Sequence, residues 1–127
     1  MNSFTHSIRV YWEDTDGGGI VYYANYLKFA ERARTEWLRA LGHDQGELRE
    51  KLGVVFVVRE CRVRYRAPAR LDDMLGVSVE AVKSMRHKIQ LRQIVTRDAD
   101  ICAELDVELV AVNAATGALA EIPVALN

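Results

Sequence analysis

The stretch EDTDGGGIVYYANY, residues 13–26, contains three acidic side chains, three consecutive glycines and three tyrosines. Loops of this kind can hold a metal ion, bind a phosphate or carry a catalytic carboxylate. A calcium loop that began at Asp14 would need an oxygen ligand at its fifth position and a bidentate Glu at its twelfth. Those positions are Gly18 and Asn25, so no calcium site is predicted. The histidines that a zinc site would need are scattered singly, at His6, His43 and His87, and no metal site is expected.

The three glycines do not form a nucleotide-binding motif. The segment GGGIVY matches neither GxxxxGK(S/T) nor GxGxxG after a strand. The N-terminus of the helix that follows could bind an anion, but Glu13, Asp14 and Asp16 would repel a free phosphate. Either the glycines make a turn while the acids face water, or the loop serves a different chemistry.

The acidic loop stands directly before a predicted helix. A carboxylate a few residues ahead of a helix N-terminus can attack an acyl carbon or activate water against it. The helix N–H groups then bind the developing oxyanion, and each such donor is typically worth about 3–4 kcal/mol. Glycines let the backbone approach without side-chain clash, and no GxSxG motif indicates a serine nucleophile. Acyl-transfer chemistry is therefore predicted beside the simpler interpretation of a solvated turn.

The composition indicates one soluble globular domain that spans residues 1–127. Lys and Arg number 17 and Asp and Glu 18, and this net charge of −1 indicates no nucleic-acid partner. The N-terminal segment MNSFTHSIRV has no apolar leader, and no apolar run approaches about 20 residues, so we expect a cytoplasmic protein without a transmembrane segment. Cys61 and Cys102 are isolated and are predicted to be core or half-buried thiols.

Hydrophobic periodicity predicts one strand followed by one long helix. Ile8, Val10 and Trp12 alternate with polar neighbours, as in a strand. From residue 25 to residue 41 the apolar residues recur at spacings of three and four, and Gly42 supplies a C-terminal stop. This helical stripe comprises Tyr26, Ala30, Ala33, Trp37 and Leu41.

The rest of the chain is predicted to form strands, apart from one short helical turn between Gln45 and Leu52. Alternation occurs in residues 54–68, 75–81, 89–95 and 101–111, with turns at residues 97–100 and 116–117. This order predicts an α+β fold in which the long helix covers one face of an antiparallel sheet. Exposed sheet edges would be satisfied by pairing two copies, so at least a homodimer is expected.

Three motifs together resemble the signature of hotdog-fold acyl-CoA thioesterases. They are DTDGGGIVYYANYL, VRYRAPARLDDML and VKSMRHK, beginning at Asp14, Val63 and Val82. The nearest matches are the 4-hydroxybenzoyl-CoA thioesterase family and its Tol–Pal-associated acyl-CoA thioesterases, and the resemblance covers nearly the whole chain. It implies a long central helix wrapped by a curved antiparallel sheet of about five strands, assembled as dimers and often as tetramers.

The resemblance also implies the site residues. Asp16, the second Asp of the D-x-D pair, corresponds to the catalytic carboxylate, as nucleophile or as general base. The backbone N–H that polarises the thioester carbonyl falls at Tyr23. The Tol–Pal-associated group usually has His at this position, whereas the 4-hydroxybenzoyl group has Tyr. The acyl preference of this chain is therefore open, and a candidate general base is absent.

Basic residues follow in the third motif. Arg86, His87 and Lys88 match the place where these enzymes contact the phosphates of coenzyme A, which cations can bind. A solvated hairpin with protective charges is the alternative. Arg62, Arg64 and Arg66 are expected on the polar face of a sheet or at an interface, Glu31 on a helix surface, and Asp72-Asp73 in a turn.

The predicted function is hydrolysis of acyl-CoA to a free acid and coenzyme A, which is part of the substrate, with no cofactor. Acyl carrier protein is an alternative thioester donor. A second possibility is a non-catalytic acyl-CoA-binding or interaction module, although Asp16 is present. A hotdog dehydratase would need a His paired with an acid near the helix, and no histidine lies between His6 and His43.

Overall fold

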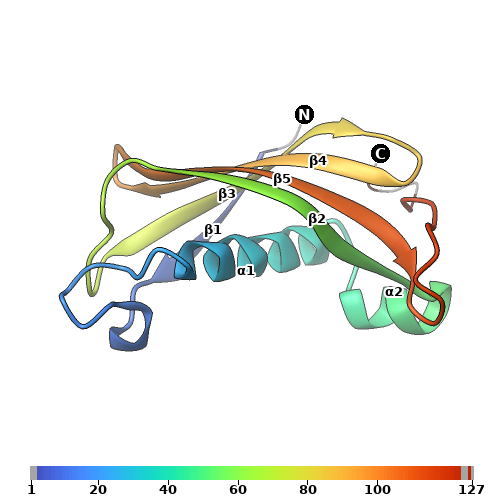
Figure 1. Ribbon diagram of the computed structural model, residues 1–127, viewed down its shortest axis with the longest axis horizontal. Coiled ribbons are helices and arrows are strands. Elements are labelled where there is room, and N and C mark those ends of the chain that lie inside the picture. The colour runs from blue at the N-terminus through green and yellow to red at the C-terminus, as the bar shows by residue number, and fades with distance from the viewer. Residues whose placement is uncertain (1–2, 124–125, 127) are drawn as a thin grey trace.

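A computed structural model of the protein describes residues 3–123 and 126. One long helix, α1 (Asn25–Ala40), lies against a five-stranded antiparallel sheet of order β1-β3-β4-β5-β2. The strands are β1 (Phe4–Arg9), β2 (Val54–Tyr65), β3 (Met74–Ser84), β4 (Lys88–Arg97) and β5 (Asp100–Asn113). Figure 1 shows the strands arching over α1, with the loop that precedes α1 at one end and the short helix α2 (Gln45–Leu52) at the other. The predicted α+β arrangement is confirmed.

Helix α1 buries one side against the sheet, as its periodicity predicts. Tyr26, Ala30, Ala33 and Trp37 are all buried. Leu41 was assigned to the same stripe, and this prediction is wrong, because Leu41 follows the last turn of α1 and is 38% exposed. Phe29, Arg34 and Leu38 complete the buried side of the helix.

Strand β1 ends earlier than the alternation around Trp12 predicts. Ile8 and Val10 are buried, but Trp12 begins a short 3₁₀ helix (Trp12–Asp14) and is 65% exposed. The Asp14 side chain accepts a hydrogen bond from the Tyr11 N–H at 2.8 Å, which turns the chain away from the sheet. The prediction that Trp12 lies in a strand is therefore wrong.

Alternating apolar side chains of β3, β4 and β5 line the face of the sheet that covers α1, here called the inner face. The predicted sets are buried or half-buried, except that Ile101 is exposed at the start of β5. A register shift between Val95 and Thr96 buries Cys102 instead. The predicted turn at residues 97–100 is present, with Asp98 in the left-handed region.

Strand β2 contains one extra residue. Val58 lies opposite Leu109 of β5, whereas Glu60 lies opposite Glu108, so Arg59 forms a bulge. After the bulge, Val63 and Tyr65 lie opposite the inner-face residues Leu105 and Ala103. Cys61 precedes them on the same side, and as part of an edge strand it is exposed, so the prediction of a buried or half-buried thiol is wrong for Cys61 and confirmed for Cys102.

The predicted short helix is confirmed as α2. The Asp44 side chain caps it by accepting the Glu47 N–H at 3.2 Å, and Gly53 ends it in the left-handed region with φ of 65°. Among the described residues, no helix is long and apolar enough to cross a bilayer.

Candidate functional site

The loop that contains Asp16 is a tight antiparallel turn. The Tyr22 N–H donates to the Asp14 carbonyl at 2.9 Å, Thr15 bridges to Val21, and the Asp16 N–H donates to the Ile20 carbonyl at 3.0 Å. Between these arms, Gly17 and Gly19 have φ of 85° and 93°, a conformation that side chains disfavour. The turn therefore requires glycine, and it leaves the Asp16 carboxylate exposed at its base.

A second segment holds this loop in place. Ile20 bridges to Arg70, the Val21 N–H donates to the Ala69 carbonyl at 2.8 Å, and the Leu71 N–H donates to the Gly19 carbonyl at 3.0 Å. The structure thus brings the motif that begins at Val63 beside the motif that begins at Asp14. Backbone bonds on both sides fix the position of Asp16.

Asp14 differs from Asp16 in its surroundings. It is only 6% exposed, and its Oδ2 accepts the Tyr11 N–H. Its carbonyl accepts both the Tyr22 N–H and the Asn25 Nδ2–H, the latter at 2.8 Å. Asp14 therefore ties the loop to the start of α1 with a buried carboxylate, whereas the Asp16 carboxylate is exposed and accepts the Gly18 N–H at 2.6 Å within its own turn.

The start of α1 has no side-chain cap. The N-cap residue is Ala24, which lies in the right-handed helical region. The N–H groups of Asn25 and Tyr26 donate to the carbonyls of Tyr22 and Tyr23, at 2.8 and 3.4 Å. Among the hydrogen bonds of the described residues, none has the N–H of Tyr23 or Ala24 as donor. Two donors at the positive end of the helix dipole are thus available to a ligand.

The turn and the helix start lie close together. Ile20, the residue opposite Asp16, is three residues from Tyr23, so extended backbone limits their Cα separation to about 11 Å. The structure therefore brings the two predicted site residues Asp16 and Tyr23 into one region.

An aromatic pocket of about 240 Å³ adjoins the helix start. It is lined by Ile20, Val21, Tyr23, Tyr26, Tyr65, Arg66, Ala67 and Pro68. The Tyr65 hydroxyl donates to the Tyr23 carbonyl at 3.1 Å, and the Tyr26 hydroxyl accepts the Ala69 N–H at 3.0 Å. Burial raises the pKa of both Tyr26 and Tyr65 above its ordinary value of 10.0. An apolar group could pack here beside the exposed carboxylate and the free N–H groups.

The basic residues of the third motif lie elsewhere. Arg86 pairs with Glu121 at 2.8 Å, the His87 Nδ1 lies 2.8 Å from the Ala120 carbonyl, and Lys88 pairs with Glu108 at 3.4 Å. The hairpin between β3 and β4 that carries them is at the end of the sheet near α2 (Figure 1). The length of β3 separates it from the Asp16 loop by about 30 Å. A single chain does not bring these residues to Asp16.

Three other predictions concern charged residues outside the loop. Glu31 lies on the exposed side of α1, as expected. Asp72 and Asp73 form the predicted turn, in which Asp72 has φ of 70° and the Asp73 carboxylate accepts the Arg70 N–H at 2.8 Å. Arg62 and Arg64 lie opposite Asp106 and Glu104 on the polar face of the sheet.

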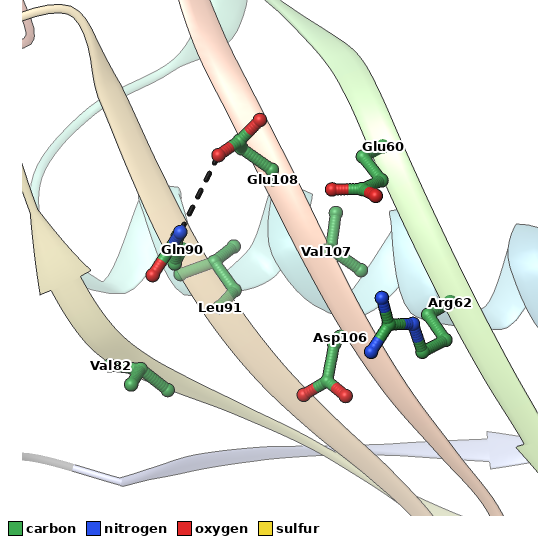
Figure 2. Close-up of a pocket in the computed structure, with 8 residues that line it drawn as sticks. All are labelled: Glu60, Arg62, Val82, Gln90, Leu91, Asp106, Val107 and Glu108. Atoms are coloured by element: carbon green, nitrogen blue, oxygen red, sulfur yellow. Dashed lines mark hydrogen bonds between the residues drawn. The ribbon is translucent and has the colours of Figure 1, made fainter.

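Another pocket, of about 230 Å³, lies on that outer face, on the side of the sheet away from α1 (Figure 2). Glu60 and Arg62 come from β2, Asp106 and Glu108 from β5, and Gln90 from β4 donates to Glu108 at 3.5 Å. This pocket mixes charges of both signs and lies across the sheet from α1. Among the described residues, no group of three or more His, Cys, Asp or Glu side chains is placed to hold a metal ion.

Sequence reasoning missed Ala24 and Tyr65. A signal for Ala24 was present, since no Ser, Thr, Asp or Asn occupies the cap position of a helix that begins at Asn25. For Tyr65 the alternation showed which side of β2 it faces. Its partner on the chain, Tyr23, is 42 residues away and could not be read from that pattern.

Comparisons with known proteins identify the family to which the chain belongs. A family model described as the Thioesterase-like superfamily matches residues 10–127. The chain is 46% identical over 112 residues to the acyl-CoA thioester hydrolase YbgC of Escherichia coli O6:H1, a match that covers 87% of this chain and 82% of that protein. It is 40% identical over 112 residues to the acyl-CoA thioesterase YbgC of Haemophilus influenzae, covering 88% and 82%. A solved structure of a probable thioesterase from Bartonella henselae superposes with a TM-score of 0.91 at 28% identity, covering 96% of this chain and 100% of that one.

Proposed function

The chain belongs to the Thioesterase-like superfamily, has the hotdog fold and is a thioester hydrolase; from this premise we propose that it hydrolyses acyl-CoA with Asp16 as its catalytic carboxylate. The observation that supports this assignment is that an exposed carboxylate and two free N–H groups lie in one region of the chain. Asp16 lies at the base of a rigid turn, and the N–H groups of Tyr23 and Ala24 lie at the start of α1.

Asp16 could act in either of two ways. As a nucleophile, its oxygen attacks the thioester carbonyl carbon, the C–S bond breaks, and the thiolate of coenzyme A leaves and takes a proton from water. Water then hydrolyses the mixed anhydride and regenerates the carboxylate. As a general base, Asp16 takes a proton from a water molecule whose oxygen attacks the same carbon, and the tetrahedral intermediate then expels the thiolate.

Both routes place negative charge on the former carbonyl oxygen. The free N–H groups of Tyr23 and Ala24 are the proposed donors to this oxyanion, supported by the helix dipole. The acyl group would extend toward the pocket lined by Tyr26 and Tyr65. The side chain of Tyr23 replaces the His of the Tol–Pal-associated group, so the proposed chemistry uses only its backbone.

We extend the proposal to assembly and substrate binding. β2 is an edge strand with Val57 and Val58 exposed, a surface suited to pairing with a second copy. We propose that the protein forms at least a homodimer, and that the complete assembly is a homotetramer. Because the hairpin with Arg86, His87 and Lys88 is about 30 Å from Asp16 within one chain, these residues would bind the phosphates of coenzyme A held in another copy's site.

Two further parts of the proposal concern the cellular location of the protein and the carrier of the acyl group in its thioester substrate. We place it in the cytoplasm, where acyl-CoA is the proposed substrate and acyl carrier protein an alternative donor. Turnover of matched acyl-CoA and acyl carrier protein thioesters would separate these donors.

The test is release of coenzyme A, detected with a thiol reagent, from short, long and aromatic acyl-CoAs. Wild type is expected to turn over at least one of them. Asp16→Asn should lower kcat by about 10²- to 10⁴-fold, whereas Glu13→Gln, which alters an exposed acid of the same stretch, should not. Undiminished turnover in Asp16→Asn would contradict the assignment. Binding without release by wild type would instead favour the non-catalytic module.

A further inference from the structure

The peptide unit between Tyr23 and Ala24 is held from outside the helix. Helices are usually capped by Ser, Thr, Asp or Asn, whose side chains bind the first free N–H groups. Here the cap residue is Ala24, so its N–H remains available. The carbonyl of the same peptide belongs to Tyr23, and it accepts a hydrogen bond from the Tyr65 hydroxyl at 3.1 Å.

Packing sets the position of that hydroxyl. The Tyr65 ring contacts the rings of Tyr23 and Tyr26 edge to face, with centroids 6.0 and 5.6 Å apart and interplanar angles of 85° and 63°. The Tyr26 ring is itself anchored, because its hydroxyl accepts the Ala69 N–H. Although Tyr65 is 47% exposed, these two ring contacts restrict the position from which it presents its hydroxyl.

The two free N–H groups differ in what supports them. The Tyr23 N–H belongs to a peptide whose carbonyl, that of Tyr22, accepts the Asn25 N–H at 2.8 Å. The Ala24 N–H belongs to the peptide whose carbonyl, that of Tyr23, accepts the Tyr65 hydroxyl. The Tyr26 N–H also donates to this carbonyl, but at 3.4 Å that bond is long, so Tyr65 is its shorter partner. A hydrogen bond accepted by a peptide carbonyl polarises the unit and strengthens its N–H as a donor.

We infer that Tyr65 is a positioning residue of the thioesterase site, whose hydroxyl orients and polarises the Tyr23–Ala24 peptide so that the Ala24 N–H donates to the thioester oxyanion. This role rests on the proposed function. It assigns chemistry to the hydroxyl of a residue on strand β2, in the second motif, which the proposed function uses only as part of the pocket wall. Burial raises the pKa of Tyr65, so its hydroxyl keeps its proton and stays a donor at neutral pH.

The test is Tyr65→Phe, which keeps the ring contacts and removes only the hydroxyl. We expect kcat to fall about threefold to tenfold with KM within about twofold of wild type, because the lost interaction strengthens in the transition state. Tyr22→Phe is the matched control. It removes the phenolic hydroxyl from the neighbouring ring, whose centroid lies 4.9 Å from that of Tyr23, and should leave kcat unchanged.

A second measurement reports on the peptide itself. In amide NMR spectra of the ligand-free protein, the Ala24 proton should move upfield in Tyr65→Phe and stay in place in Tyr22→Phe. A merely structural role for Tyr65 would lower the melting temperature without moving kcat or this resonance, and that result would overturn the inference. A raised KM at constant kcat would also overturn it.

The two levels of the proposal fail separately. If wild type releases coenzyme A from no thioester, the proposed function fails. If wild type is active and Asp16→Asn is not, but Tyr65→Phe keeps full kcat and an unmoved Ala24 resonance, only the role of Tyr65 fails.

Discussion

The two faces of the sheet differ in the surroundings of their polar side chains. The inner face covers α1 and buries a polar pair, whereas the outer face carries a grid of charged side chains. On the inner face Gln93 is 0% exposed, accepts a hydrogen bond from Arg34 Nη1 at 3.0 Å and donates to the Ala30 carbonyl at 3.0 Å. Arg34 is 8% exposed, and burial lowers its pKa from the ordinary value of 12.5. The two side chains thus satisfy each other within an apolar core.

The outer-face grid has more contacts, and each of its ion pairs has at least one side chain that is 34% exposed or more. Its members alternate in sign across β2, β5 and β4. They are Arg62 and Arg64 of β2, Arg66 directly after it, Glu104, Asp106 and Glu108 of β5, and Lys88 and Arg92 of β4. Glu104 pairs with Arg66 at 2.8 Å and with Arg92 at 3.3 Å, and Asp106 pairs with Arg92 at 3.7 Å. Exposed pairs contribute little each, whereas a buried polar group without its partner is costly. The number of contacts on a face is therefore a poor guide to its importance for stability.

The largest expected effect comes from breaking the buried pair. Gln93→Leu leaves the Arg34 guanidinium without its acceptor, so the free energy of unfolding should fall by about 2–4 kcal/mol in urea denaturation. The double variant Arg34→Met with Gln93→Leu should recover most of this loss, because both polar groups are then gone. If the double variant lost the sum of the two single effects, the two residues would not act as a pair.

A smaller effect is expected where the inner face meets the candidate site. Tyr26→Phe removes the acceptor of the buried Ala69 N–H and should cost about 1–3 kcal/mol of unfolding free energy. The half-exposed Tyr22 provides the control, since Tyr22→Phe should change stability by less than about 0.5 kcal/mol. Equal urea midpoints for the two variants would show that the hydrogen bond to Ala69 contributes nothing.

The smallest effect concerns the outer face and depends on pH. The hydrogen bond from Arg66 holds the pKa of Glu104 below its ordinary value of 4.5. A lowered folded-state pKa stabilises the protein above pH 4.5, and this contribution is lost as the pH falls through the folded-state value. The melting temperature of wild type should therefore drop more steeply than that of Glu104→Gln below pH 4.5.

Glu13→Gln controls for the change in net charge in that comparison. Parallel melting curves for wild type and Glu104→Gln between pH 6 and 3 would show that the Arg66 bond does not couple to folding.

Much of the fold could be predicted because the core elements follow simple periods. The stripe of α1 holds except at Leu41, the alternation of β4 holds throughout, and together they contained a signal for the buried pair. Arg34 lies four residues after Ala30 in the stripe, and Gln93 stands among the apolar residues of β4. Neither position alone predicts the contact, because the register between helix and sheet is set by packing.

The candidate site shows which features local sequence patterns can predict and which they cannot. That Asp16 lies near the start of α1 could be predicted because the two are close in the sequence, and in the structure they lie in one region. Trp12 escaped prediction because the Asp14 side chain ends the strand alternation by binding the Tyr11 N–H. Tyr65 escaped because its role depends on a contact across 42 residues of chain. Local periodicity carries no information on such distant contacts.

The bulge at Arg59 acts on β2 as a frame shift acts on a reading frame. If the same sequence paired with β5 as a regular ladder, without a bulge, every side chain after Val58 would exchange faces. Arg64 would then point toward α1, and Tyr65 would point to the outer face, away from the Tyr23 carbonyl. The odd spacing from Val58 to Tyr65 puts both residues on the inner face only because the bulge lies between them. Deleting Arg59 would remove the bulge and leave both faces unchanged, whereas any other single-residue insertion or deletion between Val58 and Tyr65 that left the bulge in place would turn Tyr65 to the outer face.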